Sequence, residues 1–164
     1  MSAAGGTSTG QDRSGQGFDL HTVESVHVWL LSLDEAAASR VPAPGVWSPK
    51  QVLGHLVDSA TNNHARWARM ATEDGLTFPT WDQKAWNAVQ DWQGEPWTDI
   101  VALWAAYNRH LARFQTLLPD SALGHRARIG TLGGGEPMTL AELLAHYVRH
   151  LYLHLGQIRE RVVP

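Results

Sequence analysis

Three histidines recur at four-residue intervals near the end of the sequence. His146, His150 and His154 lie in residues 143–158, which read LLAHYVRHLYLHLGQI. On a helix, side chains four residues apart lie over one another on the same face. Two such imidazoles can therefore direct nitrogen atoms at one ion from a rigid support. A third ligand would have to come from another part of the chain, and His55 is the candidate.

Three neutral imidazoles are a suitable ligand set for zinc, nickel or another late first-row divalent ion. They leave at least one coordination position for water or substrate, as catalytic metal sites do. Spacing alone leaves a second interpretation open, in which these histidines are packed or solvated, because the chain has nine histidines and a pair at this spacing can arise by chance. The His-Glu-x-x-His motif is absent, so that motif supplies no general base.

The helix expected to carry His55 has a strong start signal. Ser48 can cap it, Pro49 suits the first helical position and Gln51 completes a capping box. We expect this helix to end near residue 72, before an Asp-Gly pair. At about 100° per residue, His55 falls at the edge of its apolar face.

A polar stripe continues from His55 along the same helix. Asn62 and Arg66 fall near this line, one turn or more further on. They could meet carboxylate groups of a substrate or cofactor. The alternative is that both face solvent.

The histidine-rich stretch belongs to the last expected helix, which starts with a capping box formed by Thr139 and Glu142. His154 lies on one shoulder of its apolar stripe, and His150 lies about 40° further round. His146 lies further out again. This arrangement is expected if His150 and His154 reach into a cleft beside the core.

Two further amphipathic helices are expected, over residues 20–40 and from Thr98 or Asp99 to just before Pro119. Prolines and a glycine in residues 41–45 break the first of them. Four long amphipathic helices without strong strand patterns indicate an all-α protein, an antiparallel four-helix bundle. Residues 126–138, with a glycine triplet, are expected to form a short hairpin-like loop before the last helix.

The connection between the second and third helices is long and rich in tryptophan. A short helix is expected there, capped by Thr80 and Gln83 and running to about Gln90, and the connection is long enough to cross over the bundle. In one interpretation the indoles only pin the connection down by packing. In the other, one or two of them, with Trp81 and Trp86 as the candidates, wall a substrate cleft.

The composition limits the function classes. The 164 residues fit one domain, and residues 1–17 are expected to form a disordered leader ahead of a bundle in residues 18–164. The absence of cysteine excludes disulfides, thiolate ligands and a thiol nucleophile from the protein itself, and it fits a reducing, cytoplasmic location. The net charge of −3 and the scattered basic residues predict no nucleic-acid partner. No apolar run approaches the roughly 20 residues of a membrane span.

Two motifs resemble the DinB/YfiT-like family of metal-binding proteins. Residues 47–58, WSPKQVLGHLVD, look like the signature of the family's second helix, and residues 150–158, HLYLHLGQI, look like its closing helix. The order and separation of the motifs also match, so the resemblance spans roughly residues 18–161.

The resemblance implies a four-helix bundle, frequently a homodimer, that holds a divalent ion with three histidines. His55 matches the ligand of the second helix, and His150 and His154 match the pair on the last helix. His146 matches no ligand position and is expected either to be exposed or to support a ligand from behind. A pair formed by His146 and His150 would instead shift the site by one turn.

Some members of this family are thiol S-transferases that use bacillithiol or mycothiol, one related enzyme is a mycothiol-dependent maleylpyruvate isomerase, and others were proposed as metal-dependent hydrolases. We therefore expect a small-molecule substrate and transfer of a low-molecular-weight thiol activated by zinc or nickel. The alternatives are hydrolysis by water activated at the metal, or a non-enzymatic, stress-related bundle that binds a metal or small molecule. No catalytic residue can be assigned beyond the metal ligands.

Overall fold

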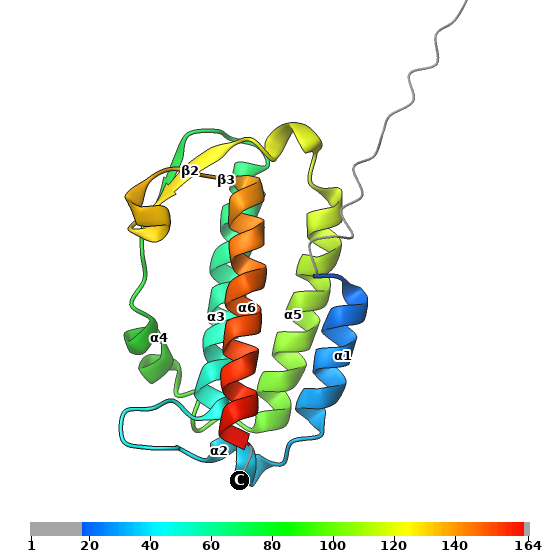
Figure 1. The fold of residues 1–164 in the computed structure, drawn as a ribbon, viewed down its shortest axis with the longest axis vertical. Coiled ribbons are helices and arrows are strands. Elements are labelled where there is room, and N and C mark those ends of the chain that lie inside the picture. The colour runs from blue at the N-terminus through cyan, green and yellow to red at the C-terminus, as the bar shows by residue number, and fades with distance from the viewer. Residues whose placement is uncertain (1–17, 163–164) are drawn as a thin grey trace, which may run out of the picture.

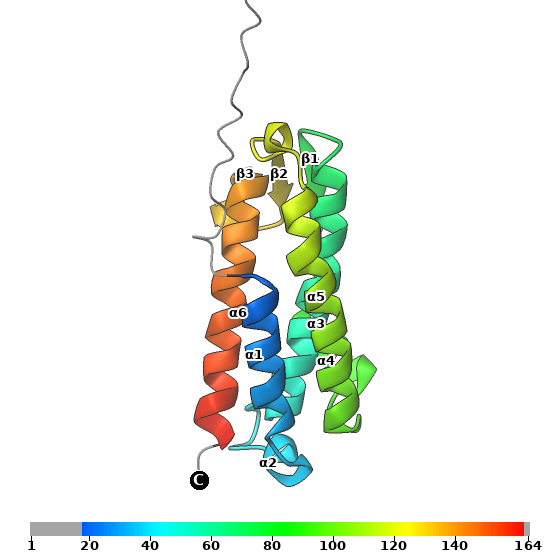
Figure 2. The same ribbon diagram turned by 90° about the vertical axis from the view of Figure 1, so that its right-hand side faces the viewer.

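The computed structural model describes residues 18–162, so the expected leader in residues 1–17 lies outside the described residues. Four long helices pack side by side as a bundle (Figures 1 and 2). Their bounds are α1 Leu20–Leu31, α3 Pro49–Met70, α5 Trp97–Leu117 and α6 Leu140–Val162. The predicted four-helix bundle is confirmed.

The connection between α3 and α5 sets the directions of the helices. It runs back along the bundle and contains the short helix α4 (Gln83–Gln90), so α3 and α5 point the same way, whereas α6 runs opposite to α3 (Figure 1). Helix α3 packs against both α5 and α6, and α1 packs against α5. The seam between α3 and α6 is therefore the place where the two histidine motifs can meet.

The single helix expected over residues 20–40 is wrong, because the chain breaks after Leu31 and resumes as α2 (Glu35–Ser39). The Ser32 hydroxyl donates to the Trp29 carbonyl at 2.6 Å, which offers that carbonyl a partner other than the next helical turn. The Asp34 carboxylate then accepts from the Ala37 backbone N–H at 2.7 Å and caps the new helix.

Both predicted capping boxes form. The Ser48 hydroxyl accepts a hydrogen bond from the Gln51 backbone N–H. The Gln51 side-chain oxygen in turn accepts from the Ser48 backbone N–H at 3.0 Å. At the start of α6, Thr139 and Glu142 exchange the equivalent bonds at 3.1 and 2.7 Å. The cap expected for α4 is wrong in detail, because Asp82 caps this helix instead of Thr80.

A small three-stranded sheet lies at the end of the bundle where α6 begins (Figure 1). The expected hairpin is present, since β2 (Arg126–Ile129) pairs antiparallel with β3 (Met138–Thr139). Strand β1 (Leu76–Phe78) was not expected, and it adds to the other edge of β2 in parallel. This pairing fixes the start of the long connection against the start of the last helix.

Large side chains from all four long helices fill the core. Those that are fully buried include Leu30, Leu53, Leu56, Trp67, Trp97, Ile100, Trp104, Leu111, Leu143 and Tyr147. Within this core, the Tyr147 hydroxyl donates to Asn108 Oδ1 at 2.5 Å. Over the described residues, no helix has both the length and the apolarity that a bilayer crossing requires.

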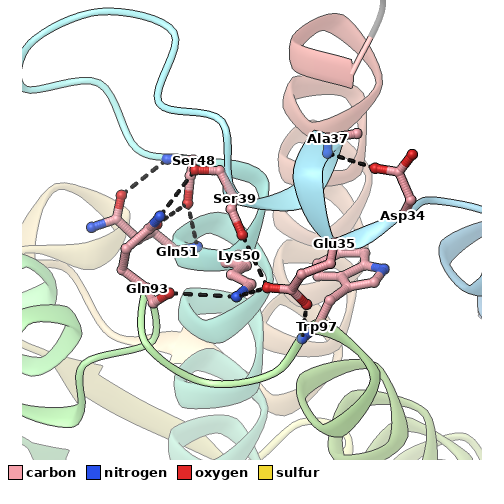
Figure 3. A network of polar contacts seen from close by, with 9 residues as sticks. All are labelled: Asp34, Glu35, Ala37, Ser39, Ser48, Lys50, Gln51, Gln93 and Trp97. Atoms are coloured by element: carbon pink, nitrogen blue, oxygen red, sulfur yellow. Dashed lines mark hydrogen bonds and ion pairs between the residues drawn. The ribbon is translucent and has the colours of Figure 1, made fainter.

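A polar network closes the opposite end of the bundle (Figure 3). The buried ammonium group of Lys50 pairs with the Glu35 carboxylate, which also accepts from the Trp97 backbone N–H at 2.8 Å. The Ser48 hydroxyl donates to Gln93 Oε1 at 2.5 Å. These bonds join α2, the start of α3, the long connection and the start of α5, so they hold the first turns of α3 beneath the histidine motif.

Candidate metal centre

Three imidazole nitrogens converge at the seam between α3 and α6. His150 Nε2 lies 3.2 Å from His55 Nε2 and 3.1 Å from His154 Nε2. Each of the three residues offers a nitrogen within 4.8 Å of the others, and they form the one group of three or more metal-ligating side chains found in residues 18–162. The structure thus brings together the three residues that the two motifs singled out.

Burial keeps these imidazoles neutral. His55 is fully buried, and the other two rings are half-buried. Burial, and then repulsion from the neighbouring imidazoles, lowers the pKa of His55 to about 3 and that of His150 to about 4. Burial also lowers the pKa of His154. The neutral form is the one that carries a free lone pair and binds a metal.

In two of the rings, the nitrogen that faces away from the cluster contacts a polar side chain. His154 Nδ1–H donates to Gln157 Oε1 at 3.0 Å, and His150 Nδ1 lies 3.5 Å from the Ser59 hydroxyl. A proton on Nδ1 leaves the lone pair on Nε2. Histidines that bind metals are commonly fixed in this way, in both tautomer and ring orientation. In contrast, His55 Nδ1 is buried with no partner among the described residues.

The spacing of the nitrogens fits a shared cation. Zn–N bonds of about 2.0–2.1 Å at tetrahedral angles place two ligand nitrogens about 3.3–3.4 Å apart, close to the 3.1 and 3.2 Å found here. Neutral lone pairs that face one another at this distance repel unless a proton or a metal ion lies between them. Three imidazoles also leave a coordination position open, whereas a closed structural site takes four protein ligands.

Tryptophans surround the His55 ring. Trp81 stacks on it with a centroid distance of 5.5 Å and an interplanar angle of 24°, and Trp47 lies 5.4 Å away on a tilt. Trp86 packs against Trp81 at 4.9 Å. The remaining tryptophans of the connection, Trp92 and Trp97, are buried as packing. The packing interpretation therefore holds for Trp92 and Trp97, and a substrate-binding role for Trp81 and Trp86 stays a prediction.

The other expected site residues are not part of the converging group. His146 stacks on His150 at a centroid distance of 6.1 Å and is half-buried. Asn62 uses its amide to donate to the Asp58 backbone carbonyl at 2.9 Å. Arg66 is only 7% exposed and lies close enough to His146 to lower the pKa of that imidazole, after the larger effects of burial and Arg149.

Two acidic residues beside the motifs are occupied elsewhere. The Asp58 carboxylate accepts from Gln90 Nε2 at 2.8 Å and from Trp92 Nε1 at 3.2 Å. Glu142 caps α6 through the Thr139 N–H. Both oxygens of Asp58 are therefore occupied, and Glu142 serves as the cap of α6.

Sequence reasoning missed three residues that contact the candidate ligands: Trp47, Ser59 and Gln157. Ser59 follows His55 by four residues and Gln157 follows His154 by three, spacings that share a helix face. A search for polar residues one turn beyond each histidine would have found both. Trp47 precedes the helix, so no helical spacing points to it.

The sequence is similar to a known protein family and to several named bacterial proteins. The model of the DinB superfamily matches residues 13–158. The chain is 29% identical over 147 residues to a Bacillus subtilis (strain 168) protein named "Putative metal-dependent hydrolase YfiT", with 80% of this chain and 81% of that protein covered. A Bacillus licheniformis protein with the same hydrolase designation is 31% identical over 116 residues, which cover 70% of this chain and 64% of the relative.

The solved structure of YfiT from Bacillus subtilis has a similar fold. It is described as having an unusual four-helix bundle topology, and it superposes with a TM-score of 0.77 over 95% of this chain and 90% of that one. Sequence identity in this superposition is 21%. The match therefore supports the arrangement of the helices.

Proposed function

This chain belongs to the DinB superfamily, and on that premise we propose that it is a divalent-metal-dependent enzyme that transfers a low-molecular-weight thiol to an electrophilic small molecule. The observation that carries the proposal is the convergence of the Nε2 atoms of His55, His150 and His154, from two helices, beside an indole wall. Zinc or nickel fits this ligand set. When bound, such an ion supplies Lewis acidity that lowers the pKa of a thiol or a water molecule in its open position.

The hydrogen bonds of Asp58 and Glu142, the two carboxylates nearest the motifs in sequence, favour thiol transfer over hydrolysis. A water nucleophile usually needs a general base within hydrogen-bond reach, and both Asp58 oxygens and Glu142 Oε2 already accept hydrogen bonds. A thiol has a much lower pKa than water, so it loses its proton to solvent without a dedicated base. Since the chain has no cysteine, the thiol must come from outside, and bacillithiol or mycothiol are suitable candidates.

In the proposed reaction a sulfur–carbon bond forms while the bond from that carbon to a leaving group, such as a halide, breaks. The thiol proton passes to solvent. Trp81, stacked on His55, would hold a flat electrophile beside the ligands, and Trp86 would support it from behind. Their role is to orient the electrophile and to exclude water from the reacting carbon.

Arg66 would bind an anionic group on the thiol or the electrophile. Its guanidinium is largely buried and, within residues 18–162, makes no hydrogen bond or ion pair. Burial lowers its pKa. A desolvated guanidinium without an acceptor favours a carboxylate or phosphate partner, which it can bind in bidentate fashion. Its electrostatic effect on His146, which stacks on His150, supports a role for this group near the cluster.

Metal-dependent hydrolysis is the second candidate, because the curated relatives carry that name. One experiment separates the two. The purified chain, loaded with zinc or nickel, is offered bacillithiol, mycothiol and cysteine with an electrophilic haloarene, and in parallel chromogenic esters and phosphoesters without thiol. We expect conjugation that a chelator and His154→Ala both abolish. Ester or phosphoester cleavage with no conjugation would favour the hydrolase, and the absence of both activities would refute an enzymatic role for these substrate classes.

A further inference from the structure

A second pair of histidines meets on the other side of α3. His64 of α3 and His110 of α5 face each other with their Nε2 atoms 3.4 Å apart and their ring centroids 4.9 Å apart. His64 follows His55 by nine residues, which is a rotation of about 180° around the helix. This pair therefore lies away from the cluster at the α3–α6 seam and takes no part in it.

Tyr107 contacts the other ring nitrogen of His64. It lies one turn before His110 on α5, and its hydroxyl is 3.0 Å from His64 Nδ1. When an ion binds Nε2, the atom that faces His110, the proton lies on Nδ1 and the Tyr107 oxygen is placed to accept it. The arrangement is the one that commonly orients histidines that bind metals. Burial, and then the neighbouring His110, also lowers the pKa of His64, which keeps the ring neutral.

Phe114 holds the partner ring. It stacks on His110 at an interplanar angle of 3° and contacts His64 edge-on at a centroid distance of 5.5 Å. Both imidazoles are therefore oriented by neighbours that do not themselves bind metal. His110 is exposed and His64 is half-buried, so the Nε2 pair is open to solvent from one side.

The distance between the two nitrogens is compatible with an ion between them. A hydrogen bond between them would be long at 3.4 Å, since N–H donors usually approach their acceptors within about 3.2 Å. Two nitrogens bound to tetrahedral zinc are separated by about 3.3–3.4 Å, whereas the right angle of a square-planar copper or nickel site brings them to about 2.9 Å. The separation thus matches two corners of a tetrahedral ion.

We propose that His64 and His110 form a second zinc site, in which two imidazoles bind one ion and water completes the tetrahedron. Over residues 18–162 no carboxylate joins the pair to make a group of three ligands, so the site is weaker and more exchangeable than the three-histidine cluster. Because α3 and α5 pack together and run in the same direction, the ion would clamp the two helices at this face. Zinc bound there stabilises the folded chain in a concentration-dependent way.

The experiment measures zinc stoichiometry by calorimetry on the full chain after treatment with a chelator, together with the melting temperature at rising zinc concentration. The wild-type chain is expected to bind two zinc ions, and His110→Ala one fewer. Tyr107→Phe removes only the hydroxyl that orients His64, and it should weaken the second site about 10–100-fold without changing the count. His21→Ala, at an exposed histidine of α1, is the matched control and should keep both ions.

The same titration in a His150→Ala, His154→Ala background separates this site from the proposed catalytic one. The double variant should still bind one zinc ion, and adding His110→Ala to it should remove that ion. This result is expected whether or not the three-histidine cluster binds metal in the wild-type chain. Zinc stoichiometry unchanged by both His64→Ala and His110→Ala would overturn the proposal. If His64→Ala does not fold, the exposed position 110 still decides the outcome, since its substitution leaves the core untouched.

Discussion

His55 Nε2 and His150 Nε2 lie 3.2 Å apart, although 95 positions separate the two residues in the chain. The contact exists because α6 returns antiparallel along α3 after the chain has crossed the bundle twice (Figure 1). Each helix offers a fixed side of the site, and only the two together supply three imidazoles. The geometry of the cluster therefore reports directly on the packing of the α3–α6 seam.

The first prediction concerns the identity of the ligands. Substituting His55 by alanine should weaken zinc or nickel binding at the cluster so that the purified variant retains little of that ion, because only two of the three imidazoles remain. His146→Ala should retain the ion, since its ring stacks on His150 and is not part of the converging group. Elemental analysis of the purified variants, with the second histidine pair removed by His110→Ala in each, is the measurement. Loss of the ion in His146→Ala alone would place the site one turn earlier on α6.

The architecture was predictable where local sequence rules and the fold agree. The capping boxes at Ser48 and Thr139 fixed the starts of the two helices that carry the histidines, and apolar periodicity predicted the long helices. The break at residues 32–34 was missed, because the apolar spacing continues through it while Asp34 starts a new helix. Strand β1 was missed because it is short and depends on pairing with β2, about fifty residues later.

For the site, spacing on a single helix was informative and contacts across helices were not. The pair His150 and His154 could be inferred from their four-residue interval, but their approach to His55 required the whole fold. The environment of Arg66 was equally invisible, since burial without a partner depends on what other helices bring beside it. Trp81 stacks on His55 only because the long connection folds back over α3.

The second prediction concerns the support behind the ligands. Gln157→Ala removes the acceptor for His154 Nδ1–H, so the imidazole can rotate and its other tautomer becomes accessible. Affinity for the ion should fall about 10–100-fold, as is typical for such outer contacts. Gln157→Glu keeps an oxygen acceptor and should retain or exceed the wild-type affinity. Competition with a chromogenic chelator measures both, and equal weakening in the two variants would contradict a role for the acceptor.

The third prediction compares two glycines in helices. A Cβ added at Gly54 would lie 2.2 Å from Trp92 Cγ, whereas one added at Gly156 meets nothing within 4 Å. Helix propensity favours alanine by up to about 1 kcal/mol at both positions, but overpacking typically costs about 1–3 kcal/mol. Gly54→Ala should therefore lower the melting temperature by several degrees, and Gly156→Ala should raise it slightly. Thermal unfolding of the metal-free proteins is the measurement, and a stabilising Gly54→Ala would show that Trp92 moves aside freely.

The fourth prediction is a pH dependence at the base of the bundle. The hydrogen bond from Lys50, and then the Trp97 backbone N–H, lower the pKa of Glu35 below its usual value of 4.5. As the pH falls, the Glu35 carboxylate is therefore protonated in the unfolded chain before it is protonated in the folded one. Its contribution to the free energy of unfolding is complete above about pH 5.5 and decreases until the pH lies below the folded-state pKa. The difference in unfolding free energy between wild type and Glu35→Gln should follow this curve. Its size should stay at or below about 1 kcal/mol, because the carboxylate is more than half exposed.

The last prediction tests the anion site. Arg66→Gln keeps a hydrogen-bond donor but removes the positive charge. The substitution leaves no partner group unpaired, because the buried guanidinium has no protein partner within residues 18–162. The variant should fold with unchanged or slightly higher stability, because a buried charge without a counter-ion costs stability. Its KM for a carboxylate-bearing thiol should rise about tenfold or more, as expected for the loss of a charge-assisted hydrogen bond worth about 1.5–3 kcal/mol, while kcat changes little. The matched measurement uses a neutral thiol of similar size, for which wild type and variant should have the same KM. An equal rise in KM for both thiols would mean that Arg66 affects the structure of the site and does not bind the carboxylate of the thiol.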